Sequence, residues 1–182
     1  LLIDKGYHPL AYRMMCLQAH YRSELEFSWE GLGAALTRLK RIVMSAAALA
    51  DAAPGDASHQ KFAPMREKFA TAISDDLNTA VALVALEEAL AVKKVDAGVK
   101  RAVVGEMDRV LGLGLFDLTR AALRIRPRDA FIAEAEIEAE LVRRKEARVA
   151  KDFATSDAIR ESLAAKGVEV MDGDPLGWEW KL

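Results

Sequence analysis

The stretch that decides the fold of the C-terminal part covers residues 148–171 and reads RVAKDFATSDAIRESLAAKG followed by VEVM. Asp152 is a good helix N-cap and Gly167 suits a helix end, because a short polar side chain accepts from free N–H groups and glycine tolerates a left-handed backbone. Residues 168–170 and the closing segment 178–180 alternate apolar and polar types, and a turn-like segment, 172–177, separates them. The sequence therefore predicts a helix followed by a β-hairpin.

A further helix is predicted just before this stretch, at residues 131–151. One side of it, at helical spacing, carries Ile137, Leu141, Arg144, Arg148 and Lys151. The stripe is apolar at its start and cationic at its end. The predicted helix–helix–hairpin unit thus combines basic side chains, aromatic rings and carboxylates. That combination suits unstacked RNA bases, on which aromatic planes stack while charged groups address the base edges.

Upstream, apolar residues recur at three-to-four spacing and predict five helices, at residues 9–20, 28–51, 58–73, 79–92 and 96–111. The segment 116–130 holds Pro127 and four arginines, and it reads as a linker. We expect a mainly α fold, an antiparallel helical bundle followed by a small α/β C-terminal domain of helices and a β-hairpin. The expected domains are residues 1–115 and 131–182, joined by the linker 116–130.

Net charge, apolar runs and cysteine content limit the kinds of partner and location that this chain can have. The 182 residues have a formal net charge of −2, so nucleic-acid contact must rest on a local patch rather than on a basic field. No apolar run approaches a membrane span, and we expect no membrane partner and a cytoplasmic location. The single cysteine, Cys16, lies in an apolar run and is expected to be buried and inert. A chain that starts at Leu1 without a methionine is interpreted as a piece of a longer protein.

No catalytic or metal-binding pattern is recognisable. Nucleotide-binding glycine loops and a nucleophile elbow are missing, and the three histidines are far apart. Asp75 and Asp76 could form a metal or acid–base pair, but helix capping explains them better because an apolar helical repeat starts just after them. We therefore predict no catalytic residue and no metal ligand in this chain.

Three ordered motifs resemble class I cysteinyl-tRNA synthetases. The first comprises Leu10-Ala11-Tyr12-Arg13, Ala19-His20-Tyr21-Arg22-Ser23 and Leu25-Glu26-Phe27-Ser28, and it is similar to the segment after that family's K-M-S-K-S loop. The second, Asp75-Asp76-Leu77-Asn78-Thr79, is similar to a D-D-x-N-T element. The third is similar to the family's C-terminal anticodon-binding signature and its closing G-x-x-W pattern, and comprises Ala147-Arg148, the run from Lys151 to Arg160, and Gly177 with Trp180.

The resemblance implies a C-terminal region of such an enzyme. The Rossmann catalytic domain, which in the family uses ATP and carries a zinc site, would lie upstream of Leu1, and this piece would need no cofactor. Its partners would be cysteine tRNA and that upstream domain. Residues 1–115 would be the stem-contact and DALR-type bundle, and residues 131–182 the small anticodon-binding domain.

The resemblance also implies roles for single residues. The family reads G, C and A, and the implied anticodon-binding residues are Arg148, Phe153, Asp157, Asp172 and Trp180. Arg148 would donate to the base edge of cytosine, the two carboxylates would accept from guanine or adenine, and Phe153 would stack. The implied phosphate contacts are Arg144, Lys151, Arg124 and Arg126.

Purely structural roles remain open for several of these residues. Phe153 and Trp180 could be core residues, Asp172 a turn residue, and Arg148 a solvated helix residue. The chain also departs from the family, with a bulky Trp178 after the closing glycine and a turn that is one residue longer. Two other functions remain open: a helical protein-interaction module without RNA binding, and a fragment of the related cysteine ligase of mycothiol synthesis.

Overall fold

The structure is a computed structural model that describes all 182 residues. Contacts divide the chain into two compact units, which we describe separately. The helical unit is Pro9–Leu123, and the hairpin unit combines Leu1–His8 with Arg124–Leu182. The predicted mainly α fold with one β-hairpin is confirmed. The sequence had not indicated that the first eight residues group with the C-terminal part.

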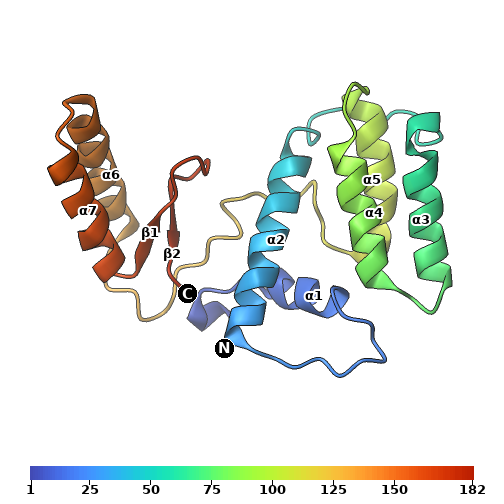
Figure 1. Ribbon diagram of the computed structural model, residues 1–182, viewed down its shortest axis with the longest axis horizontal. Coiled ribbons are helices and arrows are strands. Elements are labelled where there is room, and N and C mark those ends of the chain that lie inside the picture. The colour runs from blue at the N-terminus through green and yellow to red at the C-terminus, as the bar shows by residue number, and fades with distance from the viewer. The chain divides into compact units, whose positions relative to one another are not determined.

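The helical unit contains five α-helices. They are α1 (Pro9–Leu17), α2 (Trp29–Ala47), α3 (Ala63–Ser74), α4 (Thr79–Ala91) and α5 (Ala97–Leu111), with a 3-10 turn at Gln60–Phe62. Within this unit α3, α4 and α5 run side by side, and α1 packs on α2 and α4 (Figure 1). Leu32 and Leu39 of α2 and Leu83 and Leu86 of α4 are fully buried, as the apolar spacing predicts.

Local chemistry sets the helix ends in this unit. The Ser28 side chain accepts from the N–H of Gly31 at 3.0 Å, and that of Asp96 accepts from the N–H of Gly98 at 2.8 Å. Gly112 ends α5 in the left-handed conformation, with a φ of 65°. The helix starts predicted from apolar spacing lie close to the observed ones, except that α3 begins at Ala63 after the 3-10 turn. No helix combines the length with the apolar character that crossing a membrane requires.

The expectation for Cys16 is wrong, because the thiol is exposed. The buried residues of α1 are Ala11, Met14 and Met15, which follow helical spacing. Cys16 comes one position after this face, and each residue of an α-helix rotates by about 100°. Its side chain therefore points away from the core, although its sequence neighbours are apolar.

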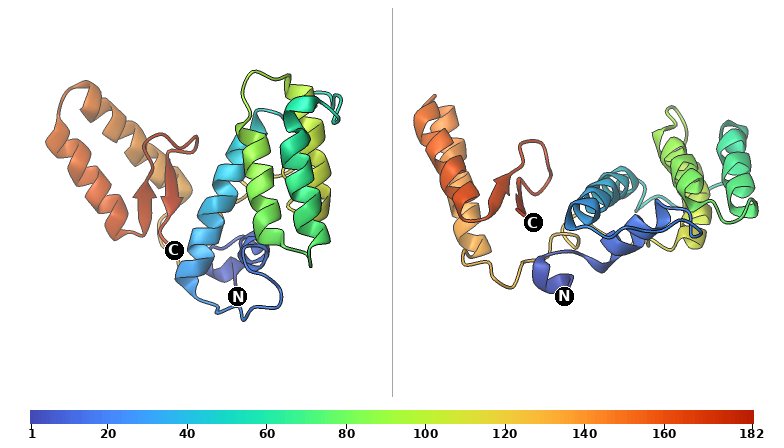
Figure 2. Two further views of the ribbon diagram at one scale, coloured as in Figure 1. Left: turned by 45° about the vertical axis from the view of Figure 1, so that its right-hand side comes forward. Right: turned by 60° about the horizontal axis from the view of Figure 1, so that its bottom comes forward.

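The hairpin unit is built from two helices and two short strands. They are α6 (Glu134–Val149), α7 (Phe153–Ala165), β1 (Val168–Val170) and β2 (Trp178–Trp180), preceded by a 3-10 turn at Ile3–Lys5. The two helices lie side by side and the hairpin packs against them (Figure 2). The strands are antiparallel, with Val168 opposite Trp180 and Val170 opposite Trp178.

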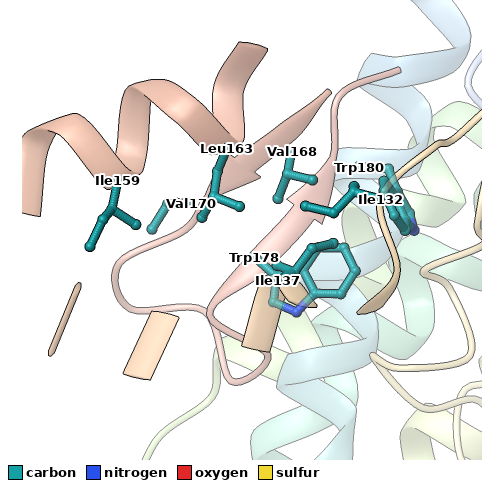
Figure 3. Close-up of a cluster of buried hydrophobic side chains, with 8 residues drawn as sticks. All are labelled: Ile132, Ile137, Ile159, Leu163, Val168, Val170, Trp178 and Trp180. Carbon is teal, nitrogen blue, oxygen red and sulfur yellow. The ribbon is translucent and has the colours of Figure 1, made fainter. Parts of the chain in front are cut away.

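The core of this unit follows from that register. Trp178 and Trp180 are two residues apart on one strand, so both rings project to the same face as the two valines. Their rings meet edge to face with centroids 4.9 Å apart, an arrangement favoured by the aromatic quadrupole. Together with the helices they form one buried cluster (Figure 3), whose members are Ile132, Ile137, Ile159, Leu163, Val168, Val170, Trp178 and Trp180.

This core provides a test of unit stability. The chain has three tryptophans, of which only Trp29 lies in the helical unit, so in a Trp29→Phe background tryptophan emission reports on the hairpin unit alone. There we expect Ile137→Ala to lower the free energy of unfolding by about 2–5 kcal/mol, because it leaves a cavity at a fully buried site. The matched control on the same helix is exposed Val142→Ala, which should change it by less than about 0.5 kcal/mol. Similar losses in urea titrations of both variants would contradict this packing.

Candidate nucleic-acid interface

Charge is segregated along α6. Its first half carries Glu134, Glu136, Glu138 and Glu140, and its second half carries Arg143, Arg144, Lys145 and Arg148. This order interacts favourably with the helix dipole, since acidic groups lie at its positive N-terminal end and basic groups at its negative C-terminal end. A local cationic end therefore forms where α6 meets α7, although the whole chain has a net charge of −2.

Arg144 faces inward from this cationic end. It shares the buried face of α6 with Ile137 and Ala147, and its side chain is only 9% exposed. Its two Nη atoms donate to Asp172 in the hairpin turn, to Oδ1 at 2.9 Å and to Oδ2 at 3.0 Å. These paired charge-assisted bonds raise the pKa of Arg144 and, from the other side, hold the pKa of Asp172 below its usual value. Asp172 is therefore an acceptor only.

Arg148 lies one turn further along α6 and is far more open. Its side chain is 50% exposed, and its Nη1 contacts the same Asp172 carboxylate at 3.3 Å. The carboxylate of Asp172 is itself 55% exposed. A donor and an ionised acceptor are thus placed side by side where solvent reaches both.

A cavity of about 490 Å³ adjoins this pair. Its lining comes from α6 and from the hairpin turn, and includes Leu141, Lys145, Arg148, Val149, Asp172 and Gly177. The walls combine apolar side chains with a few convergent charged groups, which is the usual character of a specific binding site.

The connection between α6 and α7 presents the other predicted residues. Lys151 adopts a left-handed backbone with a φ of 60°, and Asp152 caps α7 by accepting from the N–H of Thr155. Phe153 is the first residue of α7 and its side chain lies largely in solvent, at 61% exposed. Asp157 is exposed on the next turn, near enough for its charge to help raise the pKa of Arg144. The core alternative for Phe153 therefore fails.

Trp180 is different, because it lies in the core. Its ring is 3% exposed and packs in the cluster of Figure 3. A base stacks on an open ring face, and this packing leaves Trp180 none. Of the two interpretations left open by the sequence, the structure therefore matches the core residue.

Two of the arginines named as phosphate contacts also make contacts within the protein. Arg124 is 11% exposed in its side chain, lies 3.7 Å above the Trp178 ring centroid and pairs with Glu134 at 3.5 Å. Arg126 is exposed but donates to the carbonyl oxygen of Ala130 at 2.9 Å. Arg124 serves packing by covering a tryptophan face, and it is not open to a phosphate in this arrangement. Arg126 and Lys151 remain accessible.

A second polar cluster joins two of the sequence motifs in the helical unit. Asp76 accepts from the hydroxyl of Tyr21 at 2.6 Å and pairs with Nε of Arg22 at 2.6 Å. These bonds lower the pKa of Asp76, and the bond from Tyr21 has the largest effect. The capping role expected of Asp76 is therefore wrong, since the N-cap of α4 is Asn78. Asp76 and Leu77 both have positive φ, near 55°, so this turn is strained.

No group of three or more histidine, cysteine or carboxylate side chains comes together as a metal-ligand set. The sequence missed two features here, the Arg144–Asp172 pair and the Tyr21–Asp76 contact. For the first a signal was present, because an arginine on an apolar helix stripe needs a buried counter-charge. For the second, nothing local in the sequence links positions so far apart.

The Asp172 pair has a pH signature. Because its folded-state pKa is below the ordinary value of 3.8, the stabilisation by Asp172 is complete above that value and is lost as pH falls through the lower folded-state pKa. In the Trp29→Phe background we expect Asp172→Asn to lower the free energy of unfolding at pH 7 by roughly 1–3 kcal/mol. The gap between the two proteins should narrow below pH 3.8 in urea titrations at successive pH values. A gap that stays constant on acidification would show that the ion pair contributes no stability.

Comparison with known proteins finds similarity to cysteine–tRNA ligases. No protein-family model matches the chain. The chain is 67% identical to a cysteine–tRNA ligase of Novosphingobium aromaticivorans over its whole length and 43% identical to that of Zymomonas mobilis over 99% of it. It is 35% identical to that of Pseudomonas aeruginosa over 97% of its length. It spans 37%, 41% and 38% of these three relatives. Over its whole length the chain is therefore homologous to a segment of cysteine–tRNA ligases.

Proposed function

We propose that this chain is the tRNA-binding C-terminal region of a cysteine–tRNA ligase, and that its hairpin unit reads the anticodon. The whole enzyme would attach cysteine to its tRNA with ATP, and the chemistry would reside in an upstream Rossmann domain. This region contributes recognition and no catalytic residue. The homology to cysteine–tRNA ligases supports the tRNA partner.

One observation carries the anticodon assignment. A half-exposed guanidinium, that of Arg148, and an ionised carboxylate, that of Asp172, stand 3.3 Å apart beside a cavity. An unpaired base presents donors and acceptors next to each other on its Watson–Crick edge. A donor and an acceptor side by side at the protein surface can address the edges of neighbouring unpaired bases, whereas a phosphate would need donors alone.

The individual roles follow from the chemistry of each group. Arg148 would donate to cytosine, whose O2 and N3 accept. Asp172 and Asp157 accept only, so they suit the N1–H and amino group of guanine or the amino group of adenine. Phe153 is an exposed ring at the start of α7 and would stack on a splayed base, which contributes about 1–3 kcal/mol.

Backbone contacts would come from the accessible cations. Lys151 lies between the two helices, next to the N-terminus of α7, where the helix dipole also favours an anion. Arg126 is exposed on the segment that leads into α6. Such contacts fix the position of the RNA while the base edges supply specificity.

The helical unit would serve as the stem-contact and DALR-type bundle. Half-buried His20 and exposed Tyr21 and Arg22 follow α1 and cluster on the α3–α4 turn through Asp76. We assign this unit to contacts with the tRNA body and with the upstream catalytic domain.

The anticodon assignment is tested by Arg148→Ala. Binding of cysteine tRNA and of an anticodon-swapped version is measured at low salt, because each phosphate contact weakens as salt rises. We expect the intact chain to prefer cysteine tRNA, and Arg148→Ala to lose roughly tenfold to a hundredfold in affinity for it, which corresponds to about 1.4–2.8 kcal/mol. The preference over the swapped tRNA should shrink by the same factor.

The matched control is Arg143→Ala. Arg143 is also an exposed arginine on the basic half of α6, and it too pairs with a carboxylate, that of Glu140 at 2.7 Å. Its loss should weaken the binding of both tRNAs alike and leave the preference for cysteine tRNA unchanged. Equal binding of the two tRNAs by the intact chain would refute anticodon reading, and equal effects of the two substitutions would remove Arg148 from the site.

Lys151→Gly tests the phosphate contact without a stability cost. Lys151 has a φ of 60°, a conformation that glycine adopts without strain. The variant should fold at least as stably as the parent, yet bind both tRNAs more weakly. The slope of log affinity against log salt should flatten by about 0.7, the contribution of one phosphate contact to a single strand. An unchanged slope would exclude Lys151 as a phosphate ligand.

A further inference from the structure

We infer that Arg144 is a positioning residue for base recognition, which holds the Asp172 carboxylate in one orientation and does not contact the RNA backbone. The inference rests on the proposed function, because it assigns a role within the same site. It replaces the phosphate contact that the sequence resemblance implied for Arg144.

The bond geometry is the first argument. Two parallel N–H donors, at 2.9 and 3.0 Å, hold both oxygens of Asp172. A bidentate fork fixes the plane of a carboxylate, which a single bond leaves free to rotate. Asp172 needs this restraint because it follows β1, a strand of only three residues, in the hairpin turn. Arg144, on a helix of 16 residues, provides a rigid reference for it.

The burial of the two arginines separates their roles. The Arg144 side chain is nine-tenths buried, and its Nε has no hydrogen-bond partner. Leaving a buried donor unpaired costs free energy. The guanidinium therefore adopts an orientation that satisfies Asp172 with both Nη atoms although its Nε stays unpaired. To reach a phosphate, Arg144 would have to break both bonds and leave the core. Arg148 is half exposed, and its contact is longer, at 3.3 Å.

The acceptor sites left on Asp172 explain how the pair would work. An ionised carboxylate offers about four lone-pair sites. Arg144 takes one on each oxygen and Arg148 takes a second one on Oδ2, so one site on Oδ1 stays open. When Arg148 turns to a base edge, a second site on Oδ2 becomes available while Arg144 keeps the carboxylate in place. Asp172 can then accept two N–H groups from one base.

The experiment compares the intact chain with Asp172→Asn and Arg144→Lys. Each is titrated with cysteine tRNA and with three tRNAs that each carry one replaced anticodon base, over a range of salt concentrations. Lysine keeps the positive charge but lacks the planar fork. Urea titration of the hairpin-unit fluorescence confirms that each variant is folded at the temperature of the binding assay.

We expect Asp172→Asn to reduce discrimination at one anticodon position by about tenfold, the loss expected for one charge-assisted hydrogen bond. Arg144→Lys should reduce discrimination at that same position to a similar extent. It should leave the other two positions and the salt slope unchanged. A residue that merely stabilised the fold would not act on one position selectively.

Other results would overturn the inference. If Arg144→Lys weakens the binding of all four tRNAs equally and flattens the slope of log affinity against log salt, Arg144 is a phosphate ligand. If Arg144→Lys discriminates as the intact chain does while Asp172→Asn does not, the fork is only structural. If Asp172→Asn retains full discrimination, the carboxylate reads no base and the inference falls with it. Failure of the proposed function looks different, because the intact chain would then bind all four tRNAs alike.

Discussion

The hairpin unit depends on one constraint, the need of a cation on the core face of α6 for a counter-charge. Arg144 occupies a position that helical spacing makes equivalent to that of Ile137, and an unpaired guanidinium there would be strongly destabilising. The ion pair with Asp172 meets this need and ties the hairpin turn to the helix. Desolvation offsets much of the Coulombic gain of such a pair. Its main consequence is therefore positional: it sets where the turn sits and which groups remain free beside it.

The division between buried and open groups follows from this tie. Strands of three residues cannot hold a hairpin in water, so Trp178 and Trp180 are needed inside, where they pack against the two helices. Under the proposed function, stacking on a base would therefore fall to an aromatic ring outside the sheet. Phe153 has that position because α6 ends at Val149 and Asp152 caps α7 soon after it, so the first side chain of α7 projects into solvent beside the cationic end of α6. Packing thus assigns the tryptophans to stability, and it leaves Phe153 exposed for the stacking role that we propose.

The sequence was sufficient for the elements and insufficient for their contacts. Periodicity and caps located every α-helix and both strands, but neither 3-10 turn. The caps are informative because Ser28, Asn78, Asp96 and Gly112 act on their immediate neighbours. Alternation in Trp178–Trp180 predicted a strand but could not decide how completely its rings are covered, which depends on helices distant in sequence. The same holds for the inward turn of Arg144 and for the pairing of Asp76 with Tyr21, each of which joins distant segments. Cys16 shows the converse error, since apolar neighbours do not determine on which side of a helix a residue lies.

The electrostatics of the site separate affinity from selectivity. Asp172 cancels the charge of Arg144 and shares that of Arg148, so few cations at this end are left for phosphates, among them Lys145 and Lys151. Each phosphate contact to a single strand contributes about 0.7 to the salt slope, so a small number gives modest, weakly salt-dependent attraction. A carboxylate at the centre also repels any backbone that approaches without a base to bind it. In the proposed function, an RNA would gain enough to bind only when its bases satisfy both the acceptor and the donor. A chain with a net charge of −2 would in this way be selective without a basic surface.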